Sequence, residues 1–143
     1  MYTIVSERRR ARITIELSGR VSTAEALRAT SQAAAMARAD DLDRFLCDLR
    51  AVERGPGGLV EVAAAIAVHL RPGMRVAFVA CDRQRPVVRR LVRFCGSPMA
   101  MYVAETRQAA TRWLQSRRSR RPVRPPTKPE PATTASARAE SAA

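Results

Sequence analysis

The chain has few of the residues from which catalytic and metal sites are usually built. It contains one histidine, His69, and three cysteines, Cys47, Cys81 and Cys95, in 143 residues. The cysteines form no C-x-x-C pair and are odd in number, so we expect small buried thiols that stay reduced. No serine, histidine and acid set and no cluster of metal ligands is evident. We therefore expect a protein that is not an enzyme and uses no metal or cofactor.

Aromatic residues and long apolar runs are also scarce. Six residues are Phe, Tyr or Trp, which leaves few side chains for stacking on nucleic-acid bases. No apolar run is long enough to span a bilayer, and residues 1–10 lack the apolar core of a signal peptide. We expect a cytoplasmic protein, and any nucleic-acid binding should be electrostatic and unspecific.

Lysine is nearly absent, although the chain is strongly basic. One of the 26 basic residues is lysine, and the net charge is +13, of which residues 115–143 carry +5 and residues 1–114 carry +8. A GC-rich coding sequence explains arginine in place of lysine. It does not explain the excess of base over acid, which favours an acidic protein face, nucleic acid or an anionic membrane as partner.

The end of the chain differs in composition from the rest. Residues 117–143 are rich in proline, alanine, serine, threonine and arginine, with almost no large apolar residue. Such a segment cannot bury enough surface to fold. We predict one domain over residues 1–116 and a disordered basic tail over residues 117–143. The arginines from Arg117 to Arg124 either hold a polyanion loosely or only keep the tail solvated.

Within residues 1–114, apolar residues change repeatedly between the spacing of strands and that of helices. Strands 2–6 and 12–17 are predicted to form a hairpin across the charged turn 7–10. Ser22 to Glu25 matches a helix-capping box, from which a helix runs to about Arg38. The further predictions are a strand at 45–49, a helix at 59–70, a strand at 75–80, a helix at 86–95 stopped by Gly96, a strand at 99–104 and a helix at 106–115.

This order, ββαβαβαβα, predicts an α/β fold. We expect a mixed sheet with an N-terminal antiparallel hairpin, parallel strands joined by right-handed crossovers, and helices packed on the sheet. Strands 45–49 and 75–80 are almost continuously apolar, as is typical of strands covered on both faces. The last helix should pack Ala110, Trp113 and Leu114 inward.

Candidate contact residues surround the second helix. Asp48 lies near the carboxyl end of a central strand, where open α/β sheets bind ligands; without catalytic partners it is expected to bind loop amides or Arg50. The glycines beside Arg54 suit either an anion at the helix start or a plain turn into the helix. The outer side of the helix is apolar, so either a partner covers it or the surface tolerates it. The candidate interaction surface is Asp48, Arg50, Arg54, Gly57, Gly58, Val60, Ala64 and Val68.

The helix at 86–95 has a stripe of arginines on the side opposite its apolar side, and the stripe begins one residue before the helix. Arg85, Arg89 and Arg93 are spaced four residues apart, and Arg90 lies beside them. Either a solvated face or a contact for an acidic partner or a phosphate backbone explains this pattern.

In the order and spacing of these pieces, the chain resembles the STAS domain family, named for sulphate transporters and anti-sigma factor antagonists. It is most similar in pattern to the short SpoIIAA-like, or STAS/SEC14-like, bacterial members. The resemblance covers nearly all of residues 1–114 and rests on four segments: Met1–Ile4, Ile15–Gly19, Phe45–Arg50 and Ala109–Leu114. It implies a domain that works by being bound, with a regulatory protein as partner.

In anti-sigma factor antagonists of this family, a serine at the start of the helix after the third strand is phosphorylated to switch partner binding. The corresponding residues here, 48–59, include no serine or threonine. We therefore predict a non-catalytic STAS-like interaction module without this switch, bound by a regulatory protein or by a second copy of the chain. The alternatives are an apolar or acyl-chain ligand, as the SEC14-like members imply, and polyanion binding through the arginine-rich tail.

Overall fold

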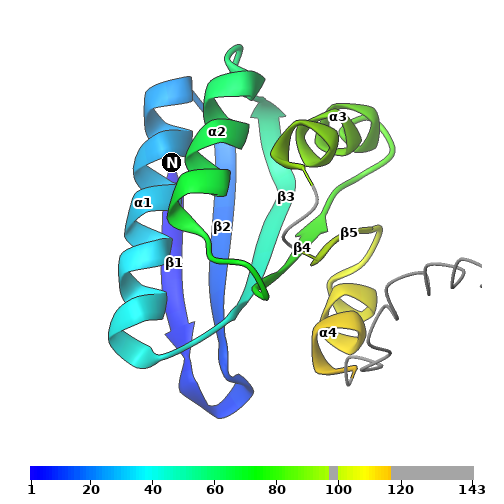
Figure 1. The fold of residues 1–143 in the computed structure, drawn as a ribbon. Coiled ribbons are helices and arrows are strands. Elements are labelled where there is room, and N and C mark those ends of the chain that lie inside the picture. Colours follow the sequence, from blue (N-terminus) through cyan, green and yellow to red (C-terminus); the bar gives the residue numbers. More distant parts are fainter. Residues whose placement is uncertain (97–99, 117–143) are drawn as a thin grey trace, which may run out of the picture.

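The computed structural model describes residues 1–96 and 100–116. Within these residues, strands and helices alternate in the predicted order and form one sheet with helices on both faces (Figure 1). The predicted α/β fold is confirmed. The elements are β1 (Tyr2–Glu7), the short 3-10 helix η1 (Arg8–Arg10), β2 (Arg12–Arg20), α1 (Thr23–Asp40), β3 (Arg44–Arg54), α2 (Leu59–His69), β4 (Arg75–Val79), α3 (Arg85–Cys95), β5 (Ala100–Ala104) and α4 (Arg107–Gln115).

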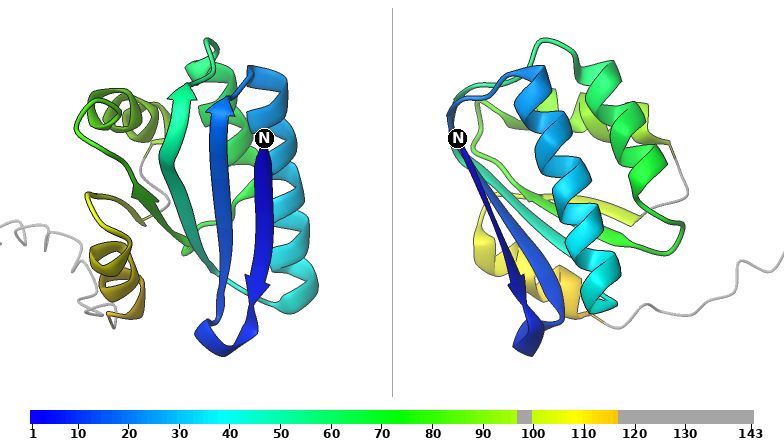
Figure 2. Two further views of the ribbon diagram at one scale, coloured as in Figure 1. Left: turned by 180° about the vertical axis from the view of Figure 1, so that it is seen from behind. Right: turned by 90° about the vertical axis from the view of Figure 1, so that its left-hand side faces the viewer.

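The strands lie in the sheet in the order in which they occur in the chain. β1 pairs antiparallel with β2, with Tyr2 opposite Leu17, and all other neighbours are parallel. Each crossover through α1, α2 and α3 moves one strand further in the same direction, so right-handed connections place these helices on one face. α4 follows the last strand and packs on the other face (Figure 2).

Each face of the sheet buries its own apolar cluster. The larger cluster lies under α1, α2 and α3 and includes Ile13, Ile15 and Phe45. The smaller one lies under α4 and includes Leu46 and Leu114. Because successive strand residues point to opposite faces, the neighbours Phe45 and Leu46 belong to different clusters. β3 is therefore covered on both sides, as its continuous apolar run predicts.

The ends of the helices follow the signals in the sequence. Ser22 is the N-cap of α1, and its hydroxyl oxygen accepts a hydrogen bond from the Glu25 amide at 3.1 Å. Thr106 caps α4 in the same way, accepting from the Ala109 amide at 3.1 Å. Gly96 ends α3 with a φ of 75°, a conformation that costs glycine little because it has no Cβ. The predicted cap and stop signals are confirmed.

The main difference from the prediction is the length of β3. The sequence indicates a strand that ends at Leu49, whereas the strand continues to Arg54. Its pairing with β4 ends at Asp48, and the rest pairs with β2 alone, with Ala51 opposite Ser18. This extension lies beyond the edge of β4 and is largely exposed, so it lacks the apolar run by which a buried strand is recognised. We call residues 49–54 the β3 extension.

A buried arginine that the sequence does not single out anchors the layer formed by α4. Arg75, the first residue of β4, is 8% exposed and donates a hydrogen bond to the Ser116 carbonyl at 2.6 Å. Its guanidinium carbon lies 4.1 Å from the ring centroid of Trp113, and the Trp113 ring stacks on Tyr102 with centroids 5.3 Å apart. Trp113 thus packs at the edge of this layer and is partly exposed, rather than inside the cluster as predicted.

Candidate functional site

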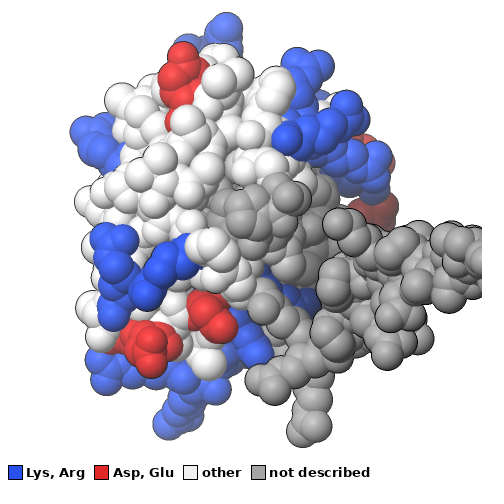
Figure 3. Space-filling model, in the orientation of Figure 1, with Lys and Arg blue, Asp and Glu red and all other residues white. Residues whose placement is uncertain are grey.

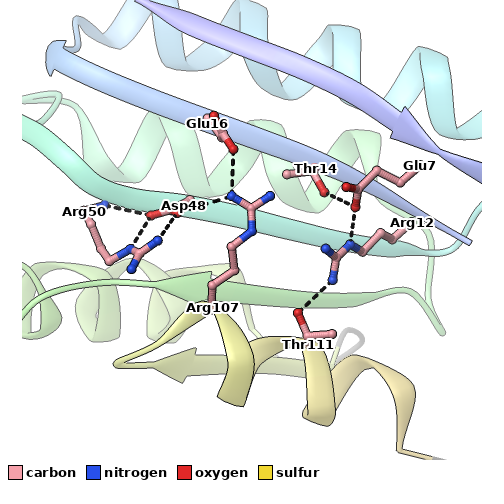
Figure 4. A network of polar contacts seen from close by, with 8 residues as sticks. All are labelled: Glu7, Arg12, Thr14, Glu16, Asp48, Arg50, Arg107 and Thr111. Atoms are coloured by element: carbon pink, nitrogen blue, oxygen red, sulfur yellow. Dashed lines mark hydrogen bonds and ion pairs between the residues drawn. The ribbon is translucent and has the colours of Figure 1, made fainter. Parts of the chain in front are cut away.

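The predicted interaction residues lie on two opposite sides of the sheet. Asp48 and Arg50 are on the face that carries α4 (Figure 4). Val60, Ala64 and Val68 lie on the outer side of α2, which covers the other face. The sheet separates the two groups, so the structure does not bring the predicted surface together as one compact contact.

The outer side of α2 is apolar and exposed. Val60 is 61% and Val68 79% exposed, and Ala64 between them is exposed as well. These residues, which we call the α2 face, are four apart and share one side of the helix. Val87 and Phe94 are further exposed apolar residues on α3, which packs beside α2. Figure 3 shows a broad uncharged surface over α2, with arginines gathered over α3.

The start of α2 is occupied by groups of the chain itself. The Gly58 amide donates a hydrogen bond to the Thr23 hydroxyl oxygen at 3.1 Å. A Cβ on Gly58 would lie 2.6 Å from a carboxylate oxygen of Glu61, so this carboxylate lies over the first turn. An acidic side chain there already complements the helix dipole. The arrangement fits a plain turn into the helix, with Arg54 and Gly57 exposed beside it.

Asp48 belongs to a polar network that joins β2, β3 and α4 (Figure 4). Its carboxylate accepts hydrogen bonds from Nε of Arg50 at 3.0 Å and from Nη2 at 2.7 Å, so the expected pairing with Arg50 is confirmed. Arg107 of α4 lies 2.7 Å from Glu16 and 3.8 Å from Asp48. Glu16 and Asp48 are directly opposite each other on neighbouring strands, and the arginine between them offsets their repulsion.

Neighbouring arginines stabilise the ionised form of Asp48. Burial raises the pKa of this carboxyl, but hydrogen bonds from Arg50 and the charges of Arg50 and Arg107 outweigh burial and leave the pKa below its ordinary value. A carboxylate kept ionised in this way is poorly suited to donate or accept a proton near neutral pH. Asp48 also lies within β3 rather than at its carboxyl end, because the strand continues to Arg54.

A second polar group lies on the same face, closer to the hairpin (Figure 4). Arg12 is 2% exposed and donates hydrogen bonds to Glu7 at 2.5 Å and to the Thr111 hydroxyl of α4 at 2.9 Å. Burial raises the pKa of Glu7, but its hydrogen bonds with Arg12 and Thr14 outweigh burial and leave the pKa lowered. Both polar groups connect α4 to the strands and act as structural contacts.

An apolar pocket of about 370 Å³ lies on the opposite face, between the sheet and the three helices α1, α2 and α3. Its wall includes side chains from each of these elements, such as Ile15, Ala29, Val52, Leu59, Ile66 and Val88. The helical spacing of apolar residues in the sequence indicates a filled core here. No pattern of residues in the sequence distinguishes a pocket from a filled core. Charged side chains occur at its rim: Glu53, Arg54 and Arg83.

The side chain of Gln84 stabilises one end of this pocket through hydrogen bonds. The Gln84 amide nitrogen donates to the carbonyls of Leu49 at 2.6 Å and Val52 at 2.8 Å, and its amide oxygen accepts from the Cys81 backbone amide at 3.1 Å. Gln84 therefore holds the β3 extension to the start of α3. On the α1 side, the pocket is lined by the small residues Ala26 and Ala29, which leave space that larger side chains would fill.

The structure divides the predicted basic stripe. Arg85 is partly buried and forms ion pairs with Asp82 and Glu105, so its guanidinium has a structural role. The other members of the stripe are exposed and have no ion pair within the described part of the chain: Arg89, Arg90 and Arg93. A contact between these three and an acidic partner stays a prediction.

The cysteines are the remaining chemically active side chains of the described residues. Cys47 and Cys95 are free and buried, as expected, whereas Cys81 is free and only partly buried. Burial raises the pKa of Cys47 to about 12 and that of Cys95 to about 11, which leaves few thiolates to react. Residues 1–96 and 100–116 contain no group of His, Cys, Asp and Glu side chains placed to hold a metal ion. None of the helices described there is long and apolar enough to cross a membrane.

Comparisons with known proteins identify the type of fold. No protein-family model matches the chain, and no curated protein sequence matches it. Solved structures do match. An anti-sigma factor antagonist from Mycobacterium paratuberculosis is 19% identical, with a TM-score of 0.57, over 81% of this chain and 96% of that one. The anti-sigma factor antagonist SpoIIAA in its unphosphorylated form is 11% identical, with a TM-score of 0.56, over 82% of this chain and 100% of that one.

A third similar structure has no assigned role. It is an uncharacterised protein with a SpoIIAA-like fold from Shewanella loihica, 15% identical, with a TM-score of 0.56, over 79% of this chain and 93% of that one. All three structures match over about four fifths of the chain with TM-scores of 0.56 or 0.57. The chain therefore has a SpoIIAA-like fold, and the fold expected from the STAS resemblance is confirmed.

Proposed function

We propose that the chain is a non-catalytic regulatory module that binds another protein, or a second copy of itself, through the α2 face. The observation that supports this proposal is the exposure of Val60, Ala64 and Val68 on one side of a helix whose other side is buried. Exposed apolar surface of this kind marks contact sites. The surface over α2 is largely uncharged (Figure 3), and charged residues are depleted in the centres of protein interfaces.

Two of the similar structures are anti-sigma factor antagonists, and this class of role agrees with the proposal. The chain lacks the hydroxyl on which a phosphorylation switch would depend, since residues 48–59 include no serine or threonine. We propose that partner binding is not gated by phosphorylation in this loop. Asp48 and Arg50 are assigned a structural role, because they are bound to each other on the far side of the sheet.

Native mass spectrometry of the full chain purified from its own host tests the proposal. We expect a complex with a second protein or a dimer, and we expect Ala64→Arg to abolish it, because a buried unpaired charge at an interface costs several kcal/mol. Ala35→Arg is the matched control, since Ala35 is an exposed alanine within α1 and outside the α2 face. A wild-type chain that is only monomeric, or a complex that survives Ala64→Arg, contradicts the proposal.

The pocket favours a second candidate function, the binding of an apolar ligand. Its volume of about 370 Å³ lies within the range of roughly 300–1,000 Å³ that small-molecule sites occupy. In this case the purified chain should carry a small bound mass and melt at a higher temperature with that molecule than without it. Polyanion binding through residues 117–143 stays a prediction, because the tail lies outside the described residues.

A further inference from the structure

We propose that the apolar pocket binds a single-chain amphiphile with an anionic head group, with the chain inside the pocket and the head at Arg54 and Arg83. This inference rests on the second candidate function, ligand binding, and names the class of ligand. It follows from three features of the described residues: the wall of the pocket, its size and the charges at its rim.

The wall offers almost no polar group to a ligand. The hydroxyl of Thr30 lines the pocket but donates a hydrogen bond to the Ala26 carbonyl at 2.9 Å. The side-chain amide of Gln84 is engaged with the β3 extension and the Cys81 amide through three hydrogen bonds. Most of the remaining wall is aliphatic. A ligand with polar atoms inside would leave them without partners, which is costly, so the buried part of the ligand must be apolar.

The size of the pocket limits the length of the buried chain. A volume of about 370 Å³ is near the lower end of the range for small-molecule sites. It suits one short or medium alkyl chain rather than the two chains of a phospholipid. The aliphatic side chains that line it, among them Ile15, Leu59 and Ile66, provide dispersion contacts without directional constraints.

The rim supplies the charge that selects the head group. Arg54 and Arg83 line the pocket and are exposed. Neither guanidinium has an ion pair among the described residues, unlike Arg50, Arg85 and Arg107. Glu53 is the acidic side chain at the rim, so the rim has a net positive charge. These arginines can form charge-assisted hydrogen bonds with an anionic head group such as a carboxylate or phosphate, whereas they repel a cationic head group.

The isoleucines of the chain provide a direct test, because only two of the four line the pocket. Ile15 and Ile66 belong to its wall, whereas Ile4 and Ile13 do not. Methyl spectra of full-length protein labelled at the isoleucine δ1 carbons should show shifts of Ile15 and Ile66 on titration with decanoate, and almost none at the other two. Decan-1-ol and decyltrimethylammonium serve as neutral and cationic probes of equal chain length. We expect decanoate to bind tightest and the cation weakest.

Substitutions at the rim separate the head group from the chain. The double variant Arg54→Gln, Arg83→Gln should weaken decanoate about fivefold, as expected for two exposed charge contacts, and should change decan-1-ol binding less than about twofold. The control Arg89→Gln, Arg90→Gln removes two exposed arginines of α3 that do not line the pocket. It should leave all three probes unaffected.

Each outcome decides a different point. If no probe shifts Ile15 or Ile66, both the ligand class and the ligand-binding function are wrong. If decan-1-ol binds as tightly as decanoate, or the rim variant binds decanoate normally, the anionic head is wrong and an apolar ligand remains. Shifts confined to Ile4 or Ile13 would place the probe elsewhere and overturn the proposal. The protein-binding function is independent of all these outcomes, because Ala64→Arg tests it.

Discussion

The two faces of the sheet are held to their helices in different ways. On one face, Arg12, Arg75 and Arg107 connect α4 to the strands through hydrogen bonds, ion pairs and a stacked aromatic ring. On the other face, α1 and α2 cover the centre of the sheet with aliphatic side chains, many of them alanines, and a pocket remains between the sheet, α1, α2 and α3. Polar contacts on this face lie at its edge, where Tyr2 and Ser6 of β1 donate hydrogen bonds to Gln32 and Asp40 of α1. Both layers bury an apolar cluster, but buried arginines add directional contacts within the α4 layer, whereas the centre of the other layer is apolar.

This difference bears on where a ligand or partner binds. Hydrogen bonds to charged groups are geometrically demanding and specify one arrangement, so the α4 layer has little freedom to adapt. Apolar packing has no directional requirement, so it tolerates hydrophobic substitutions that conserve volume. The proposed contacts, the α2 face and the pocket, both lie on the apolar side. The following predictions test whether the two faces differ as described.

The largest effect is expected from Arg75→Met on the α4 face. The substitution leaves the Ser116 carbonyl without its buried donor and removes the cation stacked on Trp113. We expect a loss of about 3 kcal/mol in the free energy of unfolding, measured by urea denaturation with circular dichroism. Arg44→Met is the control, because Arg44 forms only a long ion pair among the described residues, with Asp43 at 3.9 Å, and the change should cost no more than about 0.5 kcal/mol. Equal losses would refute the anchoring role.

A smaller effect is expected on the apolar face, and its size should depend on position within α1. Ala37 is fully buried, so Ala37→Leu overpacks the core and should destabilise by about 2 kcal/mol. Ala29 lines the pocket, where extra carbons have room, so Ala29→Leu should change stability by no more than about 0.5 kcal/mol in either direction. Thermal and urea unfolding of the two variants compare them directly. A similar cost at both positions would mean that the pocket has no spare volume.

The smallest effect is a pH dependence that arises from the α4 face. The folded-state pKa of Glu7 lies below its ordinary value of 4.5, so its contribution to stability is present above that value and is lost as the pH falls through the lowered pKa. Because Glu7 is partly exposed, we expect this contribution to be less than about 1 kcal/mol. Urea unfolding from about pH 6 to about pH 2 should show a shallower loss in Glu7→Gln than in the wild type. Parallel curves would exclude Glu7 as a source of acid sensitivity.

Much of the fold could be predicted because its signals are local. Ser22 and Gly96 act as a cap and a stop wherever a helix begins or ends, and the alternation of Ile13, Ile15 and Leu17 reports a strand with one buried face. The β3 extension could not be recognised in this way. Its charged residues resemble a loop, and it is a strand only because β2 supplies a pairing partner along that edge.

The candidate site was predictable only in part. The apolar outer side of α2 is visible in the spacing of Val60, Ala64 and Val68, and the structure shows these residues exposed. Asp48 lies on the other side of the sheet from that surface, because successive residues of β3 face opposite layers and Asp48 faces α4. The burial of Arg12 and Arg75 could not be predicted. The sequence pattern around an arginine that is buried and paired is the same as the pattern around an arginine on the surface.

By itself, the sequence determined the order of strands and helices, the caps, the two apolar runs at the centre of the sheet and the absence of a hydroxyl in the loop before α2. These properties depend on neighbouring residues and on the periods of helix and strand. Only the tertiary structure decided which face each charged residue occupies, which arginines are paired, and that a pocket remains between the sheet and the helices α1, α2 and α3. Such features depend on side chains far apart in the chain and on how completely their volumes fill the space between layers.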